Sequence, residues 1–366
     1  MFHPSFRPSL ASSRAALTRW LSPRRRRFAL ARLRSACAVQ ASLLVASCGA
    51  GDVHFDIVVP TDIGGSAYVG NTSALQKEWD DTEATLKSGE AASAALEDAL
   101  TPVPDLTGAP LVFSAHASLL VRLDGAGGFE VRDVVSGELQ SSATIPSLLD
   151  VLAVSRDGAL VAALAGEGLG TLQVVTVDDG SARDTGVSGS GASQVQFVGD
   201  ALFWVDANLT LQRFDADDNG PAVVQTPGPL VSTIVAAPDS DRLFGFGRPE
   251  TNLADDALFV LEAGEDEARA LELPAANPRL LSVGRNGCLG FLSGKSLWLS
   301  GEDGADFSTD EATFLDDRMT SLAVGPSCRS AAFTVVEDSL VAWIAQGGAS
   351  VALKAPFVPL VVRTRG

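Results

Sequence analysis

From about residue 110 to the C-terminal end, short apolar runs alternate with turns rich in Gly, Asp, Asn, Ser and Pro. The stretch from Leu152 to Gly186 is the most regular example, with three or four apolar runs joined by tight turns. Runs of four to eight residues between such turns are typical of β-strands. The pattern therefore predicts an all-β domain.

The turn at Ser155–Gly158 recurs along the chain, each time between an incoming apolar run and an outgoing one. One marker residue from each copy gives the series Ser114, Ser155, Gly199, Ala237, Gly284 and Gly325, with intervals of 41, 44, 38, 47 and 41 residues. A period of about 42 residues matches four short strands per unit, as in the blades of a β-propeller. The runs after the markers are mostly apolar, as expected for strands buried on both faces.

Closure of the propeller depends on segments outside the six visible units. An open last blade would expose a strand edge. The apolar run Phe357–Arg363 lies beyond the sixth unit, and strand-like runs at His54–Val59 and Ser66–Val69 precede the first. Pairing of these three runs would form a composite seventh blade. We prefer seven four-stranded blades; six blades closed by a single terminal strand are the alternative.

The repeats also resemble a known family. The turn Ser155–Gly158 (SRDG) and the segment Val131–Gly137 (VRDVVSG) resemble the hallmark turns of WD-type and related bacterial β-propellers. The resemblance covers about residues 110–355 and implies the propeller fold. The Gly-His pair of WD repeats is absent, so the resemblance indicates no particular subfamily.

A short helical segment is predicted before the repeats. Ser73 and Gln76 fit a capping box, and Trp79 belongs to an apolar face at helical spacing. A second helical piece is expected to reach Leu100, and Pro102 ends it because proline cannot continue a helix. The segment either packs against one end of the propeller or serves as a spacer near a membrane.

The first 47 residues are predicted to be a targeting signal. They contain nine arginines and no acidic residue, and they end in the apolar run Ala36–Ser47, which is too short to span a bilayer but suits a signal-peptide core. The sequence Val45–Cys48 (VASC) resembles the lipobox of bacterial lipoproteins, in which the cysteine is lipidated and becomes the first mature residue. Gly49 resembles the following residue in signals that direct lipoproteins to the outer membrane. A plain cleaved signal and an organellar transit peptide are the alternatives.

These patterns predict three regions. Residues 1–47 form a signal peptide that is removed, residues 48–108 a lipid-anchor tether with a strand and a helical segment, and residues 109–366 the propeller. Lipidation is assigned to Cys48, and the protein is expected to be exported to the cell envelope, at the outer membrane.

Charge narrows the range of partners. Residues 48–366 contain 18 basic and 45 acidic residues, a net charge of −27. Such a chain repels nucleic acid and anionic lipid head groups. We therefore expect no nucleic-acid partner, contact with the membrane through the lipid anchor only, and a monomer.

One acidic turn resembles part of a calcium loop. Asp215, Asp217, Asn219 and Gly220 match the first half of such a loop, D-x-D-x-N-G, in which oxygens at positions 1, 3 and 5 face one centre. Thr226 occupies position 12, where a bidentate glutamate is expected. The segment is either a Ca²⁺ site or an ordinary solvated turn. No other cofactor is expected.

Cys288 and Cys328 occupy nearly equivalent positions in consecutive units. In an exported protein an even pair of cysteines is more often oxidised than catalytic. An inter-blade disulfide is predicted, provided that adjacent blades bring the Cα atoms close enough.

No convergent catalytic set is present in the sequence. Residues 48–366 contain only two histidines, His54 and His116, and they lie far apart in the chain. A Ser-His-Asp triad or a His-rich metal site is therefore not expected. The sequence thus predicts a non-enzymatic envelope lipoprotein whose acidic propeller is a protein-binding or assembly scaffold for envelope proteins. The alternative is a propeller hydrolase or lactonase with a calcium site in the central channel. Val, Ala and Ser side chains along the channel would favour the scaffold, and converging Asp, Glu and Asn side chains the enzyme.

Overall fold

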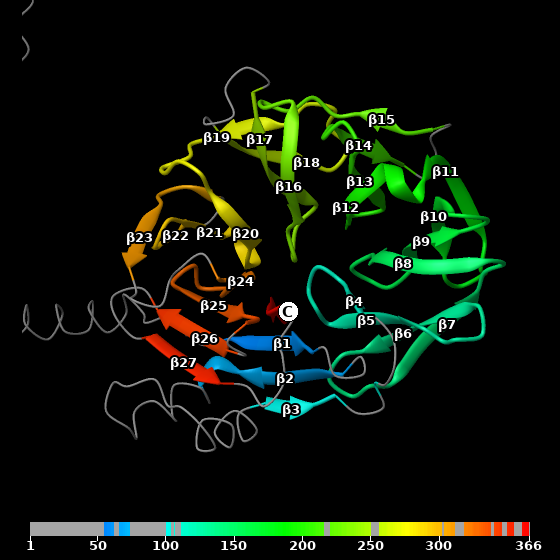
Figure 1. Ribbon diagram of the computed structural model, residues 1–366, viewed down its shortest axis with the longest axis horizontal. Coiled ribbons are helices and arrows are strands. Elements are labelled where there is room, and N and C mark those ends of the chain that lie inside the picture. Colours follow the sequence, from blue (N-terminus) through cyan, green and yellow to red (C-terminus); the bar gives the residue numbers. More distant parts are fainter. Residues whose placement is uncertain are drawn as a thin grey trace, which may run out of the picture. The chain divides into compact units, whose positions relative to one another are not determined.

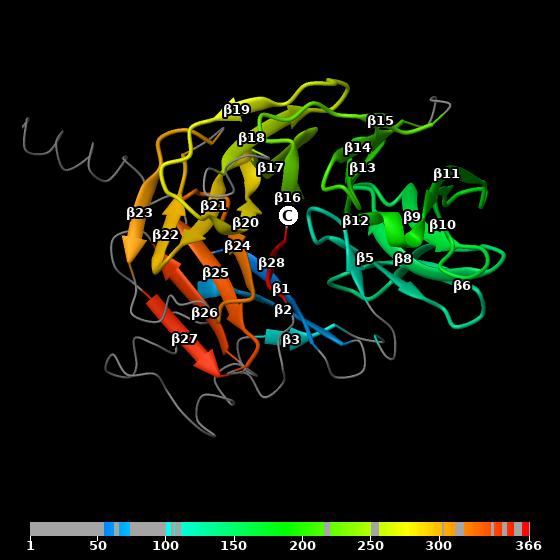
Figure 2. The same cartoon turned by 45° about the horizontal axis from the view of Figure 1, so that its top comes forward.

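The computed structural model describes residues 55–61, 66–73, 100–103, 106, 111–215, 220–249, 256–301, 304–311, 318–337, 340–345, 350–354 and 361–365. These residues belong to one compact unit, Asp52–Gly366. They form seven four-stranded antiparallel sheets arranged as blades around a central axis (Figures 1 and 2). The predicted all-β propeller is therefore confirmed, with seven blades.

Six blades are each made of four consecutive strands. From the innermost to the outermost strand they are β4 (Val112–Phe113), β5 (Leu119–Leu123), β6 (Gly128–Asp133) and β7 (Leu139–Thr144); β8 (Leu148–Val154), β9 (Leu160–Ala165), β10 (Thr171–Thr176) and β11 (Ala182–Ser188); β12 (Ala192–Val198), β13 (Ala201–Asp206), β14 (Leu211–Phe214) and β15 (Ala222–Val223); β16 (Leu230–Ala236), β17 (Arg242–Arg248), β18 (Ala257–Glu262) and β19 (Arg269–Leu271); β20 (Arg279–Val283), β21 (Leu289–Ser293), β22 (Ser296–Leu299) and β23 (Ser308–Glu311); and β24 (Ser321–Val324), β25 (Ser330–Val335), β26 (Leu340–Ala345) and β27 (Ser350–Lys354). Two short 3-10 helices, η1 (Gly189–Gly191) and η2 (Arg285–Gly287), lie in connections between strands.

The seventh blade is composite and joins the two ends of the unit. Its strand order is β28 (Arg363–Thr364), β1 (Asp56–Pro60), β2 (Ala67–Asn71) and β3 (Leu100–Pro102), with β28 innermost (Figure 1). Ile57 and Val58 of β1 pair with Thr364 and Arg363 of β28. The predicted pairing of the terminal segments is confirmed. Of the run expected to be a C-terminal strand, residues 357–360 lie outside the described residues.

The fourth strand of this blade was not predicted from the sequence. Leu100–Pro102 is a strand, β3, that pairs antiparallel with β2, and not the end of a helix as expected. A proline fits this place because β3 is the outermost strand, where a missing N–H removes no ladder hydrogen bond. Three strands within residues 48–108 thus belong to the propeller, which extends N-terminally of residue 109. The predicted helical residues 74–99 lie outside the described residues.

Polar contacts hold the composite blade closed. Asp56 accepts a hydrogen bond from the amide of Asn71 at 2.7 Å and forms an ion pair with Arg365. Burial raises the pKa of Asp56, but the hydrogen bonds from Asn71 and Arg365 lower it by more, so its pKa lies below the ordinary value. Val362 is buried, and its backbone N–H donates to Ser321 Oγ of β24 at 2.8 Å. The C-terminal strand is therefore tied both to β1 and to the neighbouring blade.

The hydrophobic core lies between the blades and not at one centre. Phe203 of β13 and Phe259 of β18 belong to one cluster shared by neighbouring blades. In the next such cluster Phe246 and Phe291 meet edge to face, with ring centroids 5.9 Å apart. The second strand of a blade is therefore covered on both faces; all six residues of β25 are buried. This arrangement explains the continuous apolar runs after the marker residues.

Each marker residue follows directly on the innermost strand of a blade, so the six marker turns meet at one rim of the channel. In five of them the marker's backbone N–H closes the turn by donating to a carbonyl four or five residues ahead, as Ser155 does to Leu160 at 2.8 Å. The Ser155 hydroxyl accepts from the N–H of Leu160 at 2.9 Å. The repeat seen in the sequence therefore marks a conserved local hydrogen-bond pattern within this chain.

Candidate functional site: the central channel

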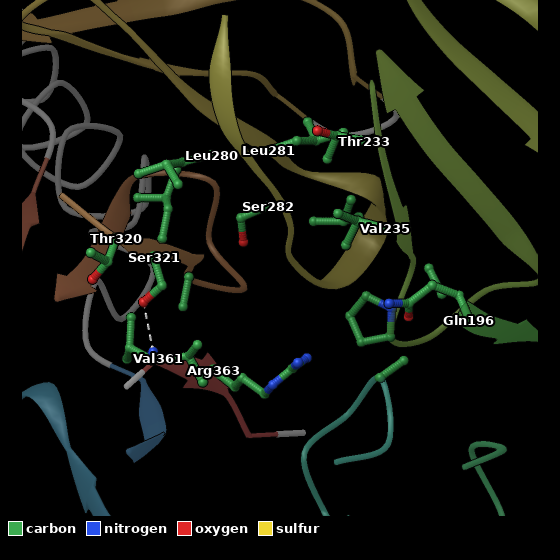
Figure 3. Close-up of a pocket in the computed structure, with 17 residues that line it drawn as sticks. Gln196, Thr233, Val235, Leu280, Leu281, Ser282, Thr320, Ser321, Val361 and Arg363 are labelled. Atoms are coloured by element: carbon green, nitrogen blue, oxygen red, sulfur yellow. Dashed lines mark hydrogen bonds between the residues drawn. The ribbon is translucent and has the colours of Figure 1, made fainter. Parts of the chain in front are cut away.

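The innermost strands of all seven blades surround a central channel. The channel contains a cavity of about 320 Å³, shown in Figure 3, and a second one of about 150 Å³. The larger cavity is lined from β12, β16, β20, β24 and β28, and the smaller from β4, β8, β12 and β28. Ala115, Gln196 and Arg363 line both. The two cavities are thus neighbouring parts of one channel.

Most residues of the channel wall are aliphatic, but polar and apolar atoms contribute about equally to the exposed surface of the larger cavity, and polar atoms dominate in the smaller one. Typical wall residues are Ala153, Val235, Ser282 and Ala323, from four different innermost strands. Small and β-branched side chains suit these strands because the blades crowd together near the axis. Among the described residues that line the two cavities, none is Asp, Glu or Asn.

Arg363 is the one charged residue among the described residues that line the two cavities. Arg363 is the first residue of β28 and follows the buried Val362, which also lines the larger cavity. In Figure 3 the Arg363 side chain extends from β28 towards the side that carries Gln196. Arg363 is exposed to solvent within the channel, and desolvation by the surrounding blades lowers its pKa. An arginine nevertheless stays protonated at neutral pH.

A bulge places Gln196 in the channel. The pairing of β12 with β13 changes register between Ser193 and Gln196. Within this bulge Gln194 has a left-handed backbone, with φ of 51°, and its side chain reaches β16 of the next blade. Its amide donates to Ser232 O at 2.7 Å and accepts from the N–H of Ile234 at 2.9 Å. The two hydrogen bonds of Gln194 connect the inner strands β12 and β16. A bulge changes the direction of the side chains beside it, and Gln196 lines both cavities.

His116 lies in the first marker turn, at the rim of the channel. Burial lowers its pKa, the nearby charges of Arg156 and Arg285 lower it further, and Asp239 raises it. Its buried Nε2 atom has no hydrogen-bond partner among the described residues. The imidazole is therefore neutral at pH 7. His116 occupies a turn, as the repeat predicted.

Of the calcium-like turn, the structure describes Asp215 and Gly220, which are absent from the residues lining the two channel cavities. Asp215 directly follows β14, the third strand of its blade, and its carboxylate accepts from Arg213 Nε at 2.5 Å. Arg213 also donates to Asp266 at 3.0 Å, so Asp215 belongs to an ion-pair network with the next blade. Asp217 and Asn219 lie outside the described residues. Within the described part of the chain no three His, Cys, Asp or Glu residues gather as a metal site. The predicted Ca²⁺ site stays a prediction.

Cys288 and Cys328 lie on adjacent blades. Their sulfur atoms are bonded, and their Cα atoms are 5.3 Å apart, within the range that a disulfide requires. Cys288 is fully buried. The blades therefore bring the two residues close enough for the predicted bond.

The predicted lipidation site, Cys48, lies outside the described residues. In the part of the chain that the structure describes, no helix is long and apolar enough to cross a membrane.

Neither Arg363 nor Gln196 was predicted as a site residue. The sequence places Arg363 at the end of an apolar run near the C-terminus. Its position in the channel depends on closure of the composite seventh blade. The sequence favoured this blade but left six blades as an alternative. The available signal is that Arg363 directly follows the apolar residues 357–362, in a segment expected to close the propeller.

No protein-family model matches this chain, and no curated protein is similar to it in sequence. Among solved structures it is similar to apo AztD from Citrobacter koseri, with 11% identity and a TM-score of 0.51 over 85% of this chain and 97% of that chain. It is similar to a streptogramin B lyase, with 13% identity and a TM-score of 0.47 over 69% and 91% of the two chains. It is also similar to the β-propeller domain of Cps50 (Swd1) from Myceliophteria thermophila, with 11% identity and a TM-score of 0.46 over 68% and 86%. The likeness to AztD, at 11% identity, supports the propeller fold and nothing beyond it.

Proposed function

We propose that this chain is an exported, lipid-anchored propeller that binds a partner in the cell envelope without catalysing a reaction. The observation that carries the proposal is the channel wall, which offers mostly aliphatic side chains, two phenylalanines, a few Ser and Thr hydroxyl groups, one glutamine and one arginine. A metal-dependent hydrolase needs oxygen ligands that converge on one centre. The described wall residues supply no carboxylate for this purpose.

The N-terminal sequence supports export and lipid anchoring. Nine arginines, an apolar run of signal-peptide length and a lipobox-like sequence ending at Cys48 follow one another in the order that lipoprotein signals require. The net charge of −27 on residues 48–366 supports contact with the membrane through a lipid chain and not through the protein surface.

The binding role is tested with the form that begins at Gly49, which contains the whole compact unit. We expect this form, cross-linked in envelope extracts of the producing organism, to capture an envelope protein that captures it in return. The same form after heat denaturation is the control. We further expect no hydrolysis of simple esters or lactones, with or without Ca²⁺. Ca²⁺-dependent hydrolysis by the folded form, without any reciprocally captured partner, would reverse the assignment in favour of the enzyme.

Lipidation is tested at Cys48. In a bacterial host that processes lipoproteins, we expect a fatty-acid label to be incorporated into the full chain and to be absent from the Cys48→Ala variant. The reason is that the thioether bond to the lipid forms on this sulfur only. Cys37→Ala is the matched control, because Cys37 belongs to the removed segment, and it should be labelled like the unmodified chain. Equal labelling of Cys48→Ala, or none in either chain, refutes the anchor.

A further inference from the structure

The channel holds a positive charge for which the described wall provides no counter-charge. Arg363 lines both cavities, and no carboxylate lies among the described residues that line them. Within the described part of the chain no ion pair or side-chain hydrogen bond holds its guanidinium group. Arg363 is exposed to solvent inside the channel, so its guanidinium group is accessible to an anion that enters. By contrast, Arg213 and Arg365 both form ion pairs.

Neutral polar groups accompany this charge. Gln196 lines both cavities with Arg363, and Thr233 lines the larger one. Figure 3 shows Gln196 on the side towards which the arginine extends, and Thr233 on the adjoining wall. An amide and a hydroxyl group can each donate one hydrogen bond to an oxygen atom of a bound anion. Most of the other residues that line the larger cavity are aliphatic, although polar and apolar atoms contribute about equally to its exposed surface.

These features select one class of ligand. A single guanidinium group balances one negative charge, and its planar fork matches the two oxygens of a carboxylate. The acidic protein surface disfavours polyanions. A cavity of about 320 Å³ is at the lower end of the size range of small-molecule sites. We propose that the central channel binds a monocarboxylate with an apolar body, its carboxylate paired with Arg363 and its body against the aliphatic wall. This inference rests on the proposed binding role and names the ligand chemistry of that site.

The carboxylate has two possible sources: a free alkanoic acid, or the C-terminal carboxylate of a partner protein that enters the channel. Octanoate and a short peptide with apolar C-terminal residues represent the two sources. Octanol, octylamine and the C-terminal amide of the same peptide have the same apolar bodies without the negative charge. Binding to the form that begins at Gly49 is measured by isothermal titration calorimetry.

We expect octanoate, the free-acid peptide, or both to bind, and the uncharged and cationic analogues to bind at least about tenfold more weakly, the factor that corresponds to about 1.4 kcal/mol. Arg363→Gln should weaken binding by a similar factor, whereas Arg363→Lys should retain part of it. Arg269→Gln, on the exposed outer strand β19, is the matched control and should bind like the unmodified chain. Octanoate alone points to a free acid, and the peptide alone to a partner's C-terminus.

Gln196→Met provides a variant that is independent of blade closure, because Gln196 lies on β12 and not on the terminal strand. It should weaken carboxylate binding several-fold. The proposal is overturned if neither carboxylate binds, if binding is unchanged in both Arg363→Gln and Gln196→Met, or if octyl phosphate binds more tightly than octanoate. Capture of an envelope partner together with any of these results would leave the scaffold role intact and refute only the carboxylate site.

Discussion

A chain that ends at Leu360 is expected to lose roughly 3 kcal/mol or more of its free energy of unfolding, because the composite blade then lacks its innermost strand. Burial of one valine, here Val362, contributes about 1.5–3 kcal/mol. Each backbone hydrogen bond between β28 and β1 adds about 0.5–1.5 kcal/mol. Removal of β28 also exposes the edge of β1 at Ile57 and Val58, which are otherwise fully buried.

The measurement is urea unfolding at pH 7 of the form that begins at Gly49, with and without residues 361–366. Arg365→Ala is the matched control, since it removes the ion pair with Asp56 and leaves the strand. Partly exposed ion pairs contribute about 1 kcal/mol or less. A shortened chain that unfolds at the same urea concentration as the full one would show that β28 does not close the propeller. A large loss in Arg365→Ala alone would assign the closure to the ion pair.

The fold could be predicted because its main determinants repeat. Each marker turn uses a local hydrogen-bond pattern, so residues such as Ser114 and Ser155 carry the same signal at a regular spacing. The strand after each marker is buried on both faces, which makes it apolar throughout, as in β25. Because the pattern recurs six times, the period of the blades can be recognised even where a single unit is irregular or its strands are short.

The features that could not be predicted are those that occur once. Strand β3 is three residues long, ends in Pro102, and follows a segment with helical spacing, so nothing local distinguishes it from a helix end. Leu100–Pro102 becomes a strand because it pairs with the free edge of β2, which lies about 30 residues earlier in the chain. The position of Gln196 depends on a bulge and on the bridge from Gln194 to the next blade. The channel position of Arg363 depends on the closure of the whole ring.

The disulfide between Cys288 and Cys328 is expected to contribute about 2–4 kcal/mol to the free energy of unfolding. The bond closes a loop with a sequence separation of 40 residues, and in the chain-entropy description a longer loop restricts the unfolded chain more. It also joins two adjacent blades whose inner strands β20 and β24 already contact each other. Part of the loop is therefore ordered by packing, which keeps the expected effect within this range.

The form that begins at Gly49 is well suited to the measurement because Cys288 and Cys328 are its only cysteines. Protein taken from an oxidising compartment and denatured without reductant should show no free thiols, and two after reduction. Reductant should lower the urea midpoint of this protein and have no effect on the Cys288→Ala/Cys328→Ala double variant. Two free thiols without reductant would refute the bond. Because disulfides persist mainly in oxidising compartments, that result would also weaken the proposed export, whereas a stable bond would support both.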